Sequence, residues 1–120
     1  LPERRTLMLL LRDGEDRVLL VRRPPTGVWS GMWSLPEVAD HDEAREFVAA
    51  ASEVDFEDNV PMPLIEHTFS HYRLHIAPLL WRGAAPSARI GDNAQRWQPL
   101  DALDEVGLPA PVRKLLLTLL

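Results

Sequence analysis

The sequence predicts a single α/β domain, an α/β/α sandwich in which a mixed, largely antiparallel sheet carries two main helices at about 40–52 and 110–120. The length of 120 residues fits one compact domain, and 46% hydrophobic with 26% charged residues is the usual balance of a folded protein. Short apolar or alternating runs lie between turn residues, and two stretches repeat apolar residues at helical spacing. The longest apolar run, 115–120, is too short to span a bilayer, so we expect no membrane association.

The expected strands are separated by turn signals. Residues 6–11 are apolar nearly throughout, which is typical of a central strand. Asp13-Gly14 indicates a turn, after which 17–22 returns as the second strand of a hairpin. Residues 72–81 alternate as on a half-buried strand, and Pro78 within them indicates a sheet edge or a bulge. The remaining expected strands are 33–35 inside the loop 28–37, 65–69, and 95–98 around Trp97, while 83–92 is expected to be a loop.

Both helices are predicted from spacing and from their end signals. The first begins at Asp40, which has capping-box spacing to Glu43, and its acidic first turn suits the helix dipole. The second has Pro111 near its first position. The apolar faces consist of Ala44, Phe47, Val48 and Ala51 in the first helix and of Val112, Leu115, Leu116 and Leu119 in the second.

Charge is unevenly distributed along the chain. The net charge of −5 argues against a general DNA clamp, because non-specific affinity comes from phosphate neutralisation. However, residues 37–60 hold 9 acidic and 1 basic side chain, whereas 1–36 hold 6 basic and 4 acidic, and 61–120 hold 6 basic and 5 acidic. An acidic segment turned away would leave a tolerable DNA-facing side. Cysteine is absent, which excludes disulfides, iron–sulfur clusters and thiolate metal sites from this chain.

The stretch from Gly31 to Glu53 resembles the Nudix box of pyrophosphate hydrolases. Gly31 and Glu37 have the box separation, and Arg45-Glu46-Phe47 follows at the right distance. The glutamate pair of the box is replaced by Ala49-Ala50, and its glycine by Ser52. In the Nudix family that pair supplies carboxylate ligands for Mg²⁺, and two methyl groups cannot. The resemblance therefore implies a Nudix-like fold with no metal site and no catalytic residue.

Three further stretches are similar to the C-terminal domains of adenine DNA glycosylases. They are 22–36, 67–76 and 107–116, with Trp97 before the last helix, and together they span nearly the whole chain in the family's order. The resemblance implies a single Nudix-like domain over 1–120 that recognises 8-oxoguanine opposite mispaired adenine in duplex DNA. It also implies a bacterial, cytoplasmic, nucleoid-associated protein. In the parent enzyme, an N-terminal catalytic domain with a 4Fe–4S cluster would remove the adenine. That domain is expected to be absent from this chain, which is expected to hold no cofactor.

The resemblance assigns the lesion contact to Phe69, Ser70 and His71. Oxidation at C8 of guanine turns the N7 acceptor into an N–H donor and adds an O8 acceptor, and a serine hydroxyl can accept as well as donate. Phe69 is the expected wedge beside the lesion, and His71 is expected to contact a phosphate or orient the turn. The expected phosphate contacts are Arg22, Arg23 and Arg73.

Simpler interpretations stand beside these assignments. A phenylalanine at the end of an apolar strand is usually core, and a serine at a turn usually serves the turn itself. His67, His71 and His75 are four residues apart, which on a strand separates neighbours by about 13 Å, too far to share a metal. Two other function classes stay open: an active nucleotide pyrophosphohydrolase, and a protein-interaction module that docks through the acidic segment 37–60.

Overall fold

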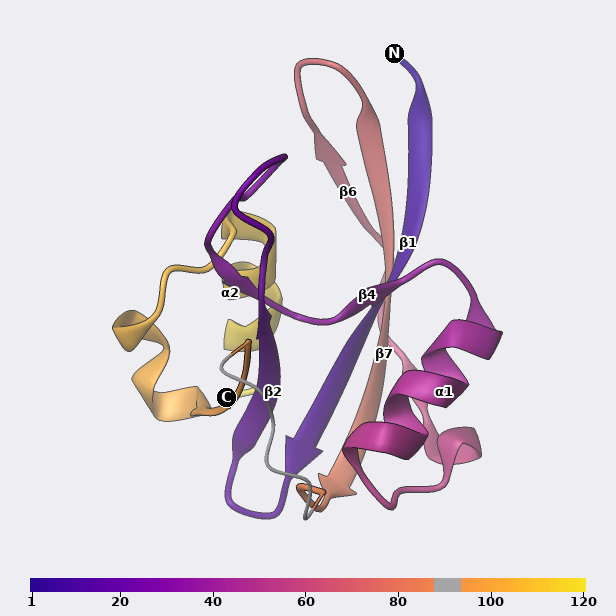
Figure 1. The fold of residues 1–120 in the computed structure, drawn as a ribbon, viewed down its shortest axis with the longest axis vertical. Coiled ribbons are helices and arrows are strands. Elements are labelled where there is room, and N and C mark those ends of the chain that lie inside the picture. The colour runs from indigo at the N-terminus through magenta and orange to yellow at the C-terminus, as the bar shows by residue number, and fades with distance from the viewer. Residues whose placement is uncertain (88–93) are drawn as a thin grey trace.

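The computed structural model describes residues 1–87 and 94–120, so the expected loop 83–92 lies partly outside the described residues. Figure 1 shows a long, twisted pair of strands, β1 and β7, at the centre of the molecule. The strands are β1 (Glu3–Asp13), β2 (Arg17–Arg22), β3 (Trp33–Ser34), β4 (Glu37–Val38), β5 (Val60–Pro61), β6 (Ile65–Thr68), β7 (Arg73–Ala84) and β8 (Gln95–Pro99). The helices are α1 (His41–Ala51) and α2 (Ala110–Leu117), with 3₁₀ turns η1 (Phe56–Asp58) and η2 (Leu100–Glu105).

Strand β1 organises the sheet, as the apolar run predicted. It pairs in parallel with β7 along nearly its whole length, from Glu3 opposite Arg73 to Asp13 opposite Ala84. On its other side it pairs with β4 near its middle and with β2 at Arg12. Among the described strands, every pairing other than β1–β7 is antiparallel. The prediction of a mixed, largely antiparallel sheet is therefore confirmed.

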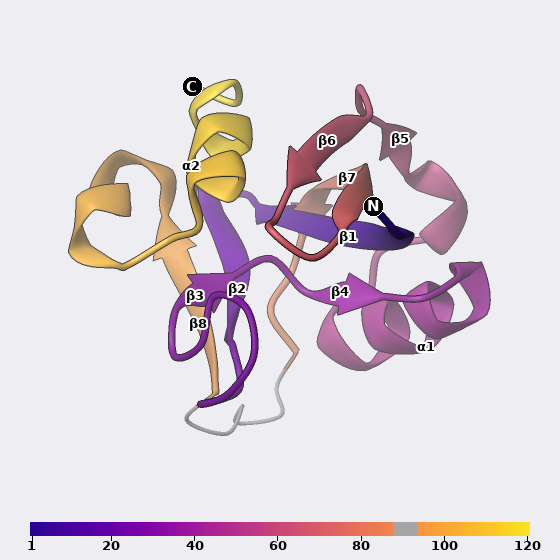
Figure 2. The same ribbon diagram turned by 90° about the horizontal axis from the view of Figure 1, so that it is seen from above.

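The helices cover opposite faces of the central strands (Figure 2). Successive side chains of a strand point to opposite faces, and β1 buries both sets. Met8 and Leu10 belong to a core cluster that includes the buried face of α2. Leu9 and Leu11 belong to a second cluster that includes the buried face of α1. The two clusters make the predicted sandwich, with one helix layer on each side.

The sequence signals at the helix ends predicted the start of α1 correctly and the end of α2 incorrectly. The side chain of Asp40 accepts a hydrogen bond from the Glu43 N–H at 2.9 Å, and Glu43 accepts one from the Ala39 N–H at 2.8 Å, so α1 begins as predicted. The predicted extent of the second helix to residue 120 is wrong, because α2 ends at Leu117. Bonds from Leu119 N–H to Leu116 and from Leu120 N–H to Leu117 tighten its end into a 3₁₀-type turn.

The expected position of Pro78 at a sheet edge or a bulge is wrong. Strand β7 is paired on both sides, with Met8 of β1 opposite Pro78. Pro78 falls where β5 ends and β6 has not yet begun, and its carbonyl accepts a hydrogen bond from the Met62 N–H at 2.9 Å. The interruption is thus in the neighbouring strand, and it tolerates a residue without an N–H.

Candidate nucleic-acid interface

The predicted turn between β6 and β7 forms the tip of a hairpin at one end of the molecule (Figure 1). The Phe69 N–H donates to the Tyr72 carbonyl at 2.8 Å and closes the turn. Ser70 and His71 lie between them and are both exposed, whereas Phe69 is half-buried against the core. The hydroxyl of Ser70 and the ring of His71 are therefore accessible to a partner at this end.

An aromatic cluster supports the turn from beneath. The Phe69 ring lies 4.7 Å from His67, 4.8 Å from Tyr72 and 5.0 Å from Trp29, measured between ring centroids. Trp29 also lies 5.5 Å from His67, so it joins a distant loop to both strands' ends. Such tilted or edge-to-face contacts are worth about 0.5–1.5 kcal/mol per pair beyond area burial. Phe69 is thus neither sealed in the core nor free, because one side of it is occupied by other rings.

The loop that presents Trp29 is folded back on itself. The Gly31 N–H donates to Pro24 at 3.0 Å and the Met32 N–H donates to Trp29 at 3.1 Å. Gly27 has φ 90° and Gly31 has φ 72°, as glycine allows, but Trp29 itself has φ 56°. A non-glycine residue in this left-handed region costs roughly 1–3 kcal/mol, so the surrounding contacts hold Trp29 in place.

Arg23 stabilises the same loop from inside. Its Nη1 lies 2.7 Å from Oε2 of Glu37, and its Nη2 lies 3.5 Å from the Val28 carbonyl. Burial raises the pKa of Glu37 above its ordinary value, against the opposing charge of Arg23 and its hydrogen bond. Of the three arginines expected at phosphates, Arg23 is therefore the one already engaged by a half-buried carboxylate.

The other two expected phosphate contacts differ from each other. Arg22 is exposed, and its guanidinium lies 5.6 Å from the ring centroid of Trp33. Arg73 lies between two carboxylates, with Nε 3.1 Å from Glu66 and Nη1 3.8 Å from Glu3. Arg22 is hence open to a new anion, whereas Arg73 would have to exchange partners.

Sequence reasoning missed two further arginines at this end of the molecule. Arg4 and Arg5 line a cleft of about 450 Å³ together with Trp29, Tyr72 and the Arg23–Glu37 pair. The Arg4 guanidinium lies 4.4 Å from the Tyr72 ring centroid. Within the described parts of the chain neither arginine has a carboxylate within ion-pair distance. The signal available in the sequence was two adjacent arginines ahead of a strand, but their neighbours depend on the β1–β7 register.

The helix that carries the box resemblance has a different character. Arg45 pairs with Glu57 at 2.8 Å and lies over the Phe56 ring at 4.4 Å, while Ala49 and Ala50 are exposed. Glu37, the first box carboxylate, pairs with Arg23 instead of facing α1. Among the residues whose positions the structure gives, no three His, Cys, Asp or Glu side chains gather as metal ligands would. In the same residues no helix has the length and apolar character needed to cross a bilayer.

Comparisons with known proteins agree with the fold. A profile of the NUDIX domain family matches residues 7–118. An adenine DNA glycosylase of Buchnera aphidicola subsp. Acyrthosiphon pisum (strain APS) is 26% identical over 117 residues, which are 97% of this chain and 33% of that protein. The chain therefore spans about a third of this relative. The resemblance to adenine glycosylases that the sequence motifs carry is confirmed.

Solved structures give the same picture at lower identity. The C-terminal domain of mouse MUTYH, in a complex with human PCNA, superposes with a TM-score of 0.68 at 16% identity over 92% of this chain and 82% of that chain. A MutT NUDIX hydrolase from Burkholderia pseudomallei gives 0.71 at 18% identity over 100% of both chains. Shewanella oneidensis NrtR complexed with a 27mer DNA gives 0.68 at 16% identity over 92% of this chain and 57% of that chain. These likenesses establish the fold alone.

Proposed function

We propose, from the premise that the chain belongs to the NUDIX domain family, that it is the lesion-recognition domain of an adenine DNA glycosylase. The observation that carries the proposal is the exposed Ser70-His71 pair at the tip of the β6–β7 hairpin, supported by an aromatic cluster. The 26% identical relative is an adenine DNA glycosylase, and a protein of which 57% matches this fold has been crystallised with DNA. The partner would be duplex DNA containing 8-oxoguanine opposite adenine.

Ser70 would read the oxidised edge of the base. The Ser70 hydroxyl can accept a hydrogen bond from N7–H of 8-oxoguanine, a donor that guanine lacks. One well-placed base contact is worth about 1–3 kcal/mol, which corresponds to roughly a ten- to hundredfold preference. Free rotation of an exposed hydroxyl would also let Ser70 donate to O8, so one residue can serve both changed atoms.

Phe69 and the arginines would position the duplex. Phe69 would insert beside the lesion with its free side and replace lost stacking, while the cluster with Trp29 and Tyr72 holds its other side. Arg22 would contact a phosphate first, because no carboxylate among the described residues engages it, and Arg4 and Arg5 would offer further phosphate contacts from the cleft beside Trp29. Arg23 and Arg73 would act mainly through the contacts that they already make.

The remaining chemistry would belong to the rest of the protein. Removing a stacked adenine requires flipping it from the duplex. We assign that step to an N-terminal catalytic domain with a 4Fe–4S cluster, in a bacterial cytoplasmic enzyme that acts on the nucleoid. This domain would need no cofactor and would supply discrimination. Hydrolysis of nucleotides by this chain is disfavoured by Ala49 and Ala50 at the box pair.

The test is Ser70→Ala in the intact glycosylase. Single-turnover cleavage rates and affinities are measured on 8-oxoguanine:A and G:A duplexes. We expect the preference for the lesion to fall about tenfold, with the fold unchanged, because a single base-edge contact is removed. Ser30→Ala is the matched control, since Ser30 is an exposed serine on the neighbouring loop. Equal losses on both duplexes, or no loss on either, would refute the role of Ser70.

A further inference from the structure

Strand β6 has a sheet partner on one side only. It pairs with β7, and the part of the chain that the structure describes offers nothing on its other edge. The Phe69 N–H donates to Tyr72, so the residues two and four positions back, His67 and Ile65, form the hydrogen-bonded pairs with β7. The alternation leaves the backbone N–H and C=O groups of Glu66 and Thr68 directed away from β7. This edge is a row of unused donors and acceptors.

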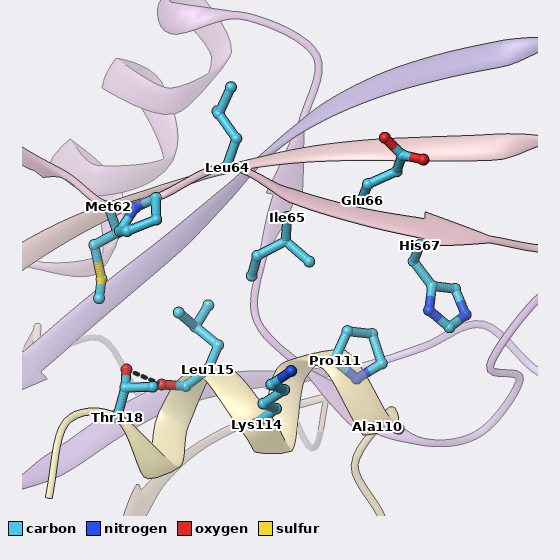
Figure 3. A pocket seen from close by; sticks show the side chains of 11 residues that line it. Met62, Leu64, Ile65, Glu66, His67, Ala110, Pro111, Lys114, Leu115 and Thr118 are labelled. Carbon is cyan, nitrogen blue, oxygen red and sulfur yellow. Dashed lines mark hydrogen bonds between the residues drawn. The ribbon is translucent and has the colours of Figure 1, made fainter.

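An apolar groove lies beside the same strand, between β6 and α2 (Figure 3). Its volume is about 800 Å³, within the range of ligand sites. Both Glu66 and His67 line it, although their side chains point to opposite sides of the strand in Figure 3. Ile65 and His67 point toward α2, so the groove lies on the α2-facing side of β6, to which alternate side chains of a strand added at the free edge would project. Met62, Ile65, Pro111 and Leu115 provide its apolar lining.

The charges at the groove are also informative. Lys114 on α2 lines it, is exposed, and has no carboxylate within ion-pair distance among the described residues. Glu66 does not neutralise it, because the Glu66 carboxylate lies 3.1 Å from Nε of Arg73. Leu64 at the rim is 80% exposed. One free cation beside an apolar channel suits a mostly apolar chain with a carboxylate, and is too little positive charge for a DNA backbone.

We propose that this groove binds an extended peptide segment of a partner protein, which adds to β6 as a further strand. The peptide's backbone would pair with Glu66 and Thr68, and alternate apolar side chains would enter the groove toward Leu115. An acidic residue of the peptide would pair with Lys114. The paired segment of the peptide would be about as long as β6, which has four residues that each span about 3.3 Å. The site adjoins the lesion-reading turn through His67, which lines the groove and contacts Phe69, but it does not include Ser70.

A peptide selection with edge variants tests the proposal. A phage-displayed library of random ten-residue peptides is panned on this chain, and the affinities of enriched peptides are measured by fluorescence anisotropy. We expect alternating apolar residues with Asp or Glu at one fixed position. Glu66→Pro removes an outward N–H and the side-chain contact with Arg73 but no backbone hydrogen bond to β7, and should weaken binding at least tenfold. Glu66→Gln is the matched control, which keeps the N–H and removes the charge, and should bind within about twofold.

Charge reversal and oligomeric state complete the test. Lys114→Glu should shift the enriched acidic position to Lys or Arg, and Arg82→Glu, outside the groove, should not. Peptides that bind Glu66→Pro as tightly as the native chain, or no enrichment at all, would overturn the proposal. So would a dimer that Glu66→Pro dissociates, which would assign the edge to a second copy, or a duplex DNA affinity that Glu66→Pro abolishes. Ser70→Ala should leave peptide affinity unchanged, so failure of the lesion-reading proposal is recognised separately.

Discussion

Helix α1 and the β6–β7 turn belong to the same fold and are stabilised in different ways. The side-chain polar contacts of α1 are local: Asp40 caps it, and Arg45 pairs with Glu57 a short way along the chain, while its buried face packs on Leu9 and Leu11 of β1. The turn is supported by Trp29 and Arg4, which come from distant parts of the sequence. The α1 region is acidic, whereas the turn lies near arginines without ion-pair partners among the described residues. Both regions expose polar groups, but those of α1 are mainly acidic, whereas the turn exposes a hydroxyl and an imidazole, on Ser70 and His71.

The largest expected effect is a loss of stability in the α1 region. It is tested by truncating one phenylalanine in each region, Phe56 beneath α1 and Phe69 at the turn. Phe56 is 8% exposed, with its ring 5.5 Å from Trp81 under α1. Phe56→Ala should lower the free energy of unfolding by about 3–5 kcal/mol, because a buried aromatic ring is removed. Urea unfolding measures this change. In the folded intact enzyme, the ratio of rates on 8-oxoguanine:A and G:A duplexes should not change.

Phe69→Ala is the counterpart at the turn. Phe69 is only half-buried, so its truncation should destabilise the fold less than Phe56→Ala and lower the lesion preference instead. Two results would contradict this division of roles. One is a changed lesion preference in fully folded Phe56→Ala enzyme, and the other is a Phe69→Ala variant that changes stability but not preference. In the latter case Phe69 is simply core, as its position at the end of an apolar strand first suggested.

The elements predicted correctly from the sequence are those with local causes. Asp40, Glu43 and the helical spacing of Ala44 and Val48 placed α1 within a residue at each end. The turn at Ser70-His71 followed from polar residues between two strand patterns. By contrast, β4 was expected to be loop. It is a strand because Val38 pairs with Leu7 of β1, and these residues are far apart in the sequence.

The same distinction applies to the candidate site. The residues of the turn could be named from motifs, but their support could not. Trp29 was a loop aromatic in the sequence, and its contact with Phe69 exists only after β1, β6 and β7 have assembled. Arg4 meets Tyr72 because β1 runs parallel to β7 in that register. Neither contact has a periodicity that a single sequence would reveal.

Trp29 offers the next prediction, of intermediate size. Trp29→Ala in the intact enzyme removes the contacts to Phe69 and His67, and should lower the lesion preference about two- to tenfold, since each aromatic pair is worth about 0.5–1.5 kcal/mol. Trp29→Phe keeps an aromatic ring and should retain most of the preference. If both variants behave alike, or if the preference is unchanged in Trp29→Ala, the turn does not depend on the cluster.

The smallest effect concerns the arginines that line the cleft beside the turn. Replacing Arg4 and Arg5 together by glutamine should weaken binding of the intact enzyme equally to lesion and undamaged duplexes, because phosphate contacts carry no sequence information. A plot of log affinity against log salt concentration should become shallower by about 1 for each phosphate that the variant no longer neutralises. Arg45→Gln on α1 is the control, since Arg45 already pairs with Glu57, and its slope should match the native enzyme. If Arg45→Gln lowers the slope as much as the double variant, the α1 region also faces DNA. Arg45 lies in the acidic segment 37–60, and only a cation that neutralises a phosphate releases counterions from DNA. Such a result would therefore show that the acidic segment is not turned away from the duplex.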